Sequence, residues 1–175
     1  MHSRFLVFLI FLIPGCAGIP DGVEAVEDFD AERYMGKWYE IARLENRFEE
    51  GLTRVTAFYR LRDDGGIDVI NLGYDWREKT WKQVEGRGYF VGDRDVGRLK
   101  VTFFWPFYSG YNVIRLDRED YRYALVCGSD RSYLWILARK PSLDEDVVED
   151  LVGYAKSRGF DTGELIFIEH GPPGE

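Results

Sequence analysis

Cysteine and histidine supply many of the nucleophiles, bases and soft metal ligands of proteins, and this chain of 175 residues has four such side chains. They are Cys16, Cys127, His2 and His170, and both histidines stand near an end of the sequence. This set is too small for a zinc site built from cysteine and histidine or for a scaffold with several disulfides. Carboxylates alone could bind a metal, but the sequence has no loop pattern for it. We therefore expect no metal site and no cofactor.

Cys16 follows a segment that is typical of a secreted protein. Residues 5–13 are nine consecutive apolar residues preceded by Arg4. This run is shorter than the ~20 residues that span a bilayer and matches the core of a signal peptide. Ile13-Pro14-Gly15-Cys16 resembles the lipobox of bacterial lipoproteins. The resemblance implies a signal peptide at residues 1–15 and acylation of the new N-terminal cysteine.

An acylated Cys16 would hold the protein on a membrane, with residues 16–29 as the tether. Stable anchoring takes more than one acyl chain, which a lipoprotein cysteine carries. Ala17 stands where an aspartate would imply inner-membrane retention in enteric lipoproteins. The resemblance therefore implies the outer membrane, with the protein facing the periplasm. A plain signal peptide followed by an uninvolved cysteine is the alternative.

Charge and composition limit the classes of partner. Lys and Arg number 23 against 31 Asp and Glu, which gives a formal net charge of −8. A protein that neutralises phosphates needs the opposite balance, so we expect no nucleic-acid partner. Apolar residues make up 45% of the chain, enough for one packed domain.

Alternating apolar and polar residues, interrupted by glycine and aspartate, run through most of the chain. Turn signals recur at the spacing of all-β sandwiches and barrels. Short connections between successive strands favour an up-and-down order. We predict eight antiparallel strands closed into a barrel, at residues 38–44, 54–61, 67–76, 81–90, 99–105, 111–117, 121–128 and 132–140.

One amphipathic helix and a short strand are predicted after the barrel. Ser142 and Glu145 have the spacing of a capping box, and apolar residues then recur at helical spacing. These patterns predict a helix at residues 143–158 and a final strand at 164–169. The fold class is therefore all-β, an eight-stranded barrel with one C-terminal helix. The barrel domain covers residues 30–170, and residues 171–175 form a tail.

Three motifs in order along the chain carry a resemblance to a known family. Gly36-Lys37-Trp38-Tyr39 resembles the signature that opens the first strand of lipocalins, and Arg139 resembles the arginine that ends their last barrel strand. Asp117–Leu125 occupies the place of the middle motif, in a degraded form. The resemblance covers residues 28–169 and is strongest to the bacterial outer-membrane lipoprotein lipocalins. It implies binding and carriage of fatty acids or lysophospholipids in the cell envelope, and permits a homodimer.

The signature residues have a structural role on physical grounds. A guanidinium stacks favourably on an indole ring, so we expect Arg139 and Trp38 to close one end of the barrel together. Gly36 allows a tight turn before the first strand, and Tyr39 completes the motif.

Strand alternation predicts which side chains line a ligand cup inside the barrel. Two glycines on one face of the fourth strand suggest unfilled volume there. The predicted ligand wall consists of Ala42, Val55, Ala57, Tyr59, Val69, Asn71, Gly86, Gly88, Val101, Phe103, Tyr111, Val113, Val126, Tyr133 and Trp135.

Polar groups on that wall are candidates for contact with a lipid head group. They are Asn71, Tyr111, Tyr133 and, near the rim, Arg115. Glu40 is also predicted to face inward, where its carboxylate needs a partner that the sequence does not identify.

Two other classes of function remain as alternatives to a lipid carrier. One is an enzyme on the lipocalin fold, for which Cys127 is the available nucleophile. Alternation turns Cys127 outward and no histidine is expected beside it, so we expect no enzyme. The other is an interaction module whose barrel is filled by side chains. In addition, the aromatic residues of 105–111 either pack over a barrel end or contact a partner or membrane.

Overall fold

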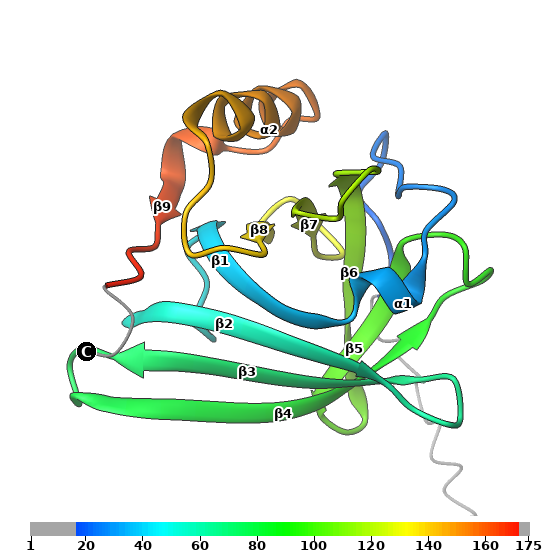
Figure 1. Ribbon diagram of the computed structural model, residues 1–175, viewed down its shortest axis with the longest axis horizontal. Helices are drawn as coiled ribbons and strands as arrows, with labels where there is room; N and C mark the ends of the chain where they lie inside the picture. The colour runs from blue at the N-terminus through cyan, green and yellow to red at the C-terminus, as the bar shows by residue number, and fades with distance from the viewer. Residues whose placement is uncertain (1–16, 172–175) are drawn as a thin grey trace, which may run out of the picture.

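The computed structural model describes residues 17–171 and shows the predicted closed barrel (Figure 1). Each strand pairs with its successor, and β1 pairs with both β2 and β8, which closes the sheet. The strands are β1 (Gly36–Leu44), β2 (Leu52–Leu61), β3 (Ile67–Asp75), β4 (Thr80–Phe90), β5 (Arg98–Phe104), β6 (Phe107–Leu116), β7 (Tyr123–Cys127) and β8 (Leu134–Ala138). The predicted signal peptide at 1–15, Cys16 and residues 172–175 lie outside the described residues.

The predicted final elements are also present. Helix α2 (Glu145–Ser157) packs on the outside of the barrel, with Leu151 and Ala155 buried in an apolar cluster that includes Ile136 and Leu125. A single helical turn, η1 (Thr162–Glu164), leads to β9 (Leu165–Phe167), which pairs with the C-terminal end of β1. No helix in the described part of the chain has the length and apolar character needed to cross a membrane.

The helix ends differ from the sequence prediction in two places. Helix α2 is capped by Asp144, whose side chain makes no capping bond, so the helix begins two residues later than the Ser142 pattern predicts. A short helix, α1 (Ala31–Tyr34), was not predicted, because four residues are too few to show periodicity. The Asp30 carboxylate caps it by accepting from the backbone N–H groups of Glu32 and Arg33.

A β-bulge in β1 corrects the predicted orientation of Ala42. The pairing with β8 shifts between Glu40 and Ala42, so two successive residues lie on the outer face there. Ala42 accordingly lies opposite Ile136, in the cluster beneath α2. Arg43, opposite Trp135, takes the inward position instead.

A second bulge, in β6, corrects Arg115 for the same reason. The pairing with β7 shifts between Val113 and Arg115. Val113 is buried inside the barrel, whereas Arg115 faces α2, 3.7 Å from the Asp150 carboxylate and over the Tyr154 ring. Arg115 is therefore not available to a ligand in the barrel.

The glycines of β4 accommodate neighbouring side chains rather than leaving the space empty. A Cβ on Gly86 would lie 2.6 Å from Cδ1 of Phe103 and 2.7 Å from the Thr102 carbonyl oxygen. A Cβ on Gly88 would be in ordinary contact with Ile67. The expectation of free volume at these two positions is wrong, and Gly86 is the space in which the Phe103 ring lies.

Gly86→Ala is accordingly expected to destabilise the barrel by about 1–3 kcal/mol, the range for overpacking. Gly153 in α2 is the matched control, because a Cβ there meets nothing within 4 Å. Gly153→Ala is expected to stabilise the helix by about 0.5–1 kcal/mol. Urea denaturation of the two variants measures both values, and equal stabilities would contradict the close approach of Phe103.

The described part of the predicted tether, residues 17–29, is hydrogen-bonded to the barrel. The side chain of Asn112 donates to the Gly18 carbonyl over 3.0 Å. Further along, the Val26 N–H donates to the Val113 carbonyl, and the Gly97 N–H donates to the Val26 carbonyl, both over 2.8 Å. The segment therefore has a fixed course over the outside of the barrel.

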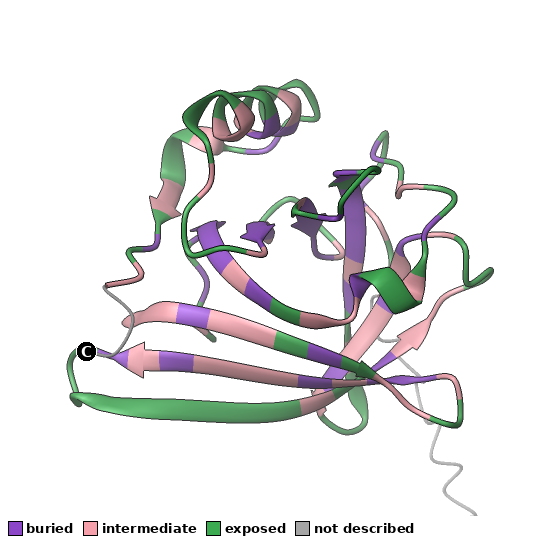
Figure 2. Ribbon diagram, in the orientation of Figure 1, coloured by how far each residue is buried: buried purple, intermediate pink, exposed green. Residues whose placement is uncertain are grey.

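Strand β4 is only partly hydrogen-bonded to its neighbour β5. Its pairing with β5 begins at Arg87, so residues 80–86 have no partner on that side. Most of this strand is exposed, in contrast to β1 and β7 (Figure 2).

Candidate functional site

Trp38 and Arg139 meet at one end of the barrel. Trp38 is fully buried, and the Arg139 guanidinium carbon lies 3.9 Å from the centroid of its ring. Arg139 also donates to the carbonyls of Lys37 (2.9 Å) and Arg33 (2.7 Å). Gly36 has a φ of 95°, which favours glycine, and a Cβ there would lie 3.4 Å from Arg139. These contacts close this end. Tyr39 belongs to the outer apolar cluster, and its ring lies 5.2 Å from that of His170.

Three tyrosine hydroxyls form a chain just above the closed end. Tyr34, from α1, shares a 2.7 Å hydrogen bond with Tyr111, and Tyr111 donates to Tyr59 over 3.0 Å. Burial raises the pKa of all three phenols, and for Tyr34 and Tyr111 the rise is large. The hydroxyls therefore stay protonated and act as hydrogen-bonding groups. The Tyr111 hydroxyl is engaged in this chain, so it is less available to a head group than the sequence prediction assumed.

The other predicted wall residues fall into two levels, apart from Ala42. In one level the side chains are buried, and its members are Val55, Tyr59, Val69, Gly88, Val113 and Val126. The partly accessible members are Ala57, Asn71, Gly86, Val101, Phe103, Tyr111, Tyr133 and Trp135. The accessible surface of the barrel interior is thus concentrated in the second group.

Asn71 and Tyr133 carry polar groups of this accessible level, in addition to the Tyr111 hydroxyl and the Trp135 indole N–H, which are hydrogen-bonded within the protein. The side-chain oxygen of Asn71 is buried and accepts no hydrogen bond from the described residues. The Tyr133 ring stacks on the Trp135 ring, with 6.0 Å between centroids. An unpaired buried acceptor is costly, so Asn71 is a place where a ligand hydroxyl would be stabilised.

A cleft of about 500 Å³ opens where β4 and β5 diverge. Val69, Gly86 and Phe103, all predicted wall residues, line it, and Trp105 and Tyr108 form its outer side. Its volume lies within the range of small-molecule sites. The cleft is also lined by the charged side chains of Arg60, Asp68, Glu85 and Arg87, which alternation places on the outer face of the sheet.

The opposite end of the barrel contains a buried ion pair that the sequence did not reveal. The Arg43 guanidinium donates to the Glu40 carboxylate over 2.7 Å, and both side chains are almost wholly buried. Arg43 also donates to the carbonyls of Glu49 (2.9 Å) and Leu52 (3.1 Å). Arg43 is thus the partner that Glu40 needed, and its inward position depends on the bulge in β1.

The same group of residues fixes the loop between β1 and β2. The Glu49 carboxylate accepts from the Trp135 indole N–H (2.9 Å) and from the Asn46 amide (2.6 Å). Burial raises the pKa of the Glu40 carboxyl well above its usual range, and the Glu49 carboxylate adds to the rise, whereas Arg43 opposes it. The loop is therefore bonded to a wall residue of the predicted site, Trp135.

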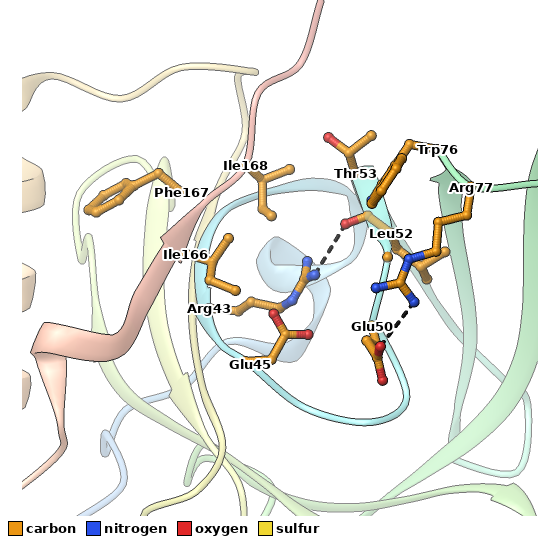
Figure 3. Close-up of a pocket in the computed structure, with 11 residues that line it drawn as sticks. Arg43, Glu45, Glu50, Leu52, Thr53, Trp76, Arg77, Ile166, Phe167 and Ile168 are labelled. Atoms are coloured by element: carbon orange, nitrogen blue, oxygen red, sulfur yellow. Dashed lines mark hydrogen bonds and ion pairs between the residues drawn. The ribbon is translucent and has the colours of Figure 1, made fainter. Parts of the chain in front are cut away.

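A second hollow, of about 490 Å³, lies outside the barrel wall between β2 and β9 (Figure 3). It exists because β2 leaves β1 beyond Tyr39, and β9 pairs with β1 in its place. Ile166 and Ile168 point into it, and Arg43 lies at its base. Glu50 and Arg77 form an ion pair at its rim.

Cys127 packs in the outer apolar cluster, away from the predicted ligand wall. Burial raises the pKa of its thiol to about 12, so the thiol is protonated at neutral pH and is a weak nucleophile. Among residues 17–171, no group of three or more histidine, cysteine or acidic side chains is arranged to hold a metal ion.

Comparison with known proteins agrees with the barrel. Residues 29–170 match the family of the lipocalin-like domain. The outer membrane lipoprotein Blc of Vibrio cholerae is 47% identical over 97% of this chain and 99% of its own, and that of Escherichia coli K12 is 53% identical over 91% and 90%. Insecticyanin of the tobacco hornworm Manduca sexta has a similar fold, with a TM-score of 0.71 at 21% identity over 88% of this chain and 87% of its own. This chain therefore belongs to the lipocalin family, as its motifs predicted.

Proposed function

We propose that this protein is an outer-membrane lipoprotein that binds one acyl lipid inside its barrel. The ligand class is a fatty acid or a lysophospholipid, and the anchor is an acylated Cys16 that holds the domain on the periplasmic side. The observation that carries the proposal is the partly accessible inner wall of the barrel, which includes Ala57, Val101 and Phe103. The names of the relatives support the membrane location.

In this proposal the acyl chain lies above the tyrosine chain, against Ala57, Val101 and Phe103. These apolar residues belong to the accessible level of the interior. Ten buried CH₂ groups contribute roughly 8 kcal/mol before the costs of association. Micromolar binding corresponds to about 8 kcal/mol after those costs, so polar contacts to Asn71 or Tyr133 are needed to reach it.

Binding without catalysis fits the chemistry of the described residues. The one described thiol, that of Cys127, lies in the outer apolar cluster and stays protonated. His170 binds the Glu40 carbonyl over 2.8 Å and lies against Tyr39, outside the barrel interior. Neither side chain can reach a ligand on the inner wall. The transport or storage of a lipid is therefore the role that we propose.

The proposal predicts a specific effect of filling the interior. Ala57 faces inward on β2 and its neighbour Phe58 faces out, with 44% of its surface exposed. Ala57→Trp is expected to weaken binding of a dansyl-labelled fatty acid at least tenfold, whereas Phe58→Trp leaves binding unchanged. Fluorescence titration of the mature chain measures both, with palmitate or a lysophosphatidylcholine as competitor.

Val101→Trp is a second blocking variant on a different strand, for use if Ala57→Trp does not fold. Equal probe affinity in the wild type and a folded blocking variant would place the probe outside the barrel. Absence of probe binding to the wild type would favour the filled-barrel interaction module.

A further inference from the structure

The turn between β5 and β6 exposes three large aromatic side chains. Phe104, Trp105 and Phe107 are 69%, 79% and 76% exposed. Of the aromatic residues at 105–111, Trp105 and Phe107 are therefore exposed, whereas Tyr111 packs inside the barrel and Tyr108 packs against Tyr89. A contiguous group of exposed aromatic residues usually marks a contact surface.

The hairpin that carries these rings is free of charge. Residues 101–114 include no Asp, Glu, Lys or Arg. The hairpin between β3 and β4 also exposes two tryptophans, Trp76 and Trp81, but they stand among charged residues such as Arg77 and Lys82. Removing charges from water is costly, so only the β5–β6 tip can enter an apolar phase without that cost.

The start of the described chain lies against this same hairpin. The Gly18 carbonyl is held by Asn112 and sits so close to Gly110 that a Cβ there would meet it at 2.6 Å. Gly110 in turn donates its N–H to the Ser129 hydroxyl over 2.8 Å. Gly110 is three residues from Phe107, which corresponds to about 10 Å along the strand.

The distance from Gly18 to the proposed anchor is short. Cys16 precedes Gly18 by two residues, which reach at most about 7 Å. The rest of the N-terminal segment is also held against the barrel, because Val26 is hydrogen-bonded to Val113 and Gly97. The chain path from the anchor to Phe107 therefore consists of about 7 Å of reach, the Gly18–Gly110 contact and about 10 Å of strand, together less than the ~30 Å thickness of a bilayer core.

We propose that the β5–β6 tip inserts into the membrane leaflet that holds the lipid anchor. The proposal rests on the proposed function through the anchor at Cys16. Tryptophan favours the interface between head groups and acyl chains, because its ring is apolar and its N–H is polar. Trp105 and Phe107 would thus be a second attachment that fixes the orientation of the barrel on the membrane.

The orientation has a consequence for the binding site. Trp105 and Tyr108 of the tip also line the β4–β5 cleft, together with Phe103 of the predicted ligand wall. With the tip inserted, the cleft opens at the membrane surface.

Tryptophan quenching by brominated lipid tests the insertion. The mature chain from residue 16 is coupled through the Cys16 thiol to a maleimide phospholipid in vesicles of phosphatidylethanolamine and phosphatidylglycerol. Cys127 does not couple, because its thiol is buried and protonated. Every strand and helix that the structure describes lies between Ala31 and Phe167, so the coupled chain contains all of them. Bromine placed near the head groups quenches only tryptophans that enter the leaflet.

Trp105→Phe is expected to remove most of the quenching seen in the wild type. Trp76→Phe, on the charged hairpin, is the matched control and should keep it. Quenching that persists in Trp105→Phe, or no quenching in the coupled wild type, overturns the proposal. So does a dimer of the wild type that Trp105→Phe dissociates, since the tip would then join two copies of the chain. Lipid binding by the uncoupled chain is measured separately, so failure here leaves the proposed function standing.

Discussion

Replacement of Arg43 by methionine is expected to lower the free energy of unfolding by about 3–5 kcal/mol, the range for removing one partner of a buried ion pair. The variant leaves the Glu40 carboxylate buried without its 2.7 Å partner. It also removes the donor to the carbonyls of Glu49 and Leu52, which fix the loop between β1 and β2. Urea denaturation at neutral pH measures the loss.

The double variant Arg43→Met/Glu40→Gln separates the buried charge from the lost packing. Because glutamine carries no charge, the double variant is expected to be more stable than Arg43→Met alone. A loss below 1 kcal/mol in Arg43→Met, or no recovery in the double variant, would contradict a buried pair.

The pH dependence of Arg43→Met follows from the same residues. The pKa of Glu40 is raised by burial and by Glu49, and Arg43 opposes the rise, so removing Arg43 raises it further. A carboxyl with a raised pKa holds its proton longer in the folded state than in the unfolded state, where the value is near 4.5. The stability of the variant should therefore increase as the pH falls from neutrality toward 4.5, relative to the wild type.

Trp38→Ala is expected to destabilise the protein by about 3–5 kcal/mol, as for other buried aromatic residues. Trp38 is fully buried, donates to the Tyr34 carbonyl over 2.8 Å and packs against the Tyr34 ring. Its loss also removes the surface on which Arg139 stacks. The closed end would then have both a cavity and an unsupported guanidinium.

Trp105→Ala is the control for Trp38→Ala, because it removes the same side chain from a site that is 79% exposed. Its effect on unfolding is expected to stay within about 0.5 kcal/mol. Similar losses in the two variants would mean that the closed end does not depend on the Trp38–Arg139 contact.

The barrel could be predicted from the sequence because its strands alternate over many residues and its turns contain glycine and aspartate. The helix and the final strand followed from the apolar spacing after Pro141. The contact of Trp38 with Arg139 was expected from the affinity of a guanidinium for an indole ring. These features depend on local patterns and on residue chemistry, both of which a sequence displays.

The wrong predictions concern features that depend on one extra residue in a strand or on contacts between strands. The bulges in β1 and β6 reverse the faces of Ala42 and Arg115, and no local pattern marks the extra residue. The glycine at position 86 suggested unfilled space inside the barrel. Whether a neighbouring side chain fills that space depends on how closely Phe103 approaches from β5. The unassigned carboxylate of Glu40 was the one available signal of the buried network, and Arg43 three residues later was its partner.

Native mass spectrometry of the mature chain, with a fatty acid and with a lysophospholipid, tests lipid binding in the barrel most directly. A complex of one protein with one lipid, lost in the folded Ala57→Trp variant and kept in Phe58→Trp, is the predicted result. No complex with either lipid, or a complex that survives filling of the barrel interior, would contradict the proposed binding site.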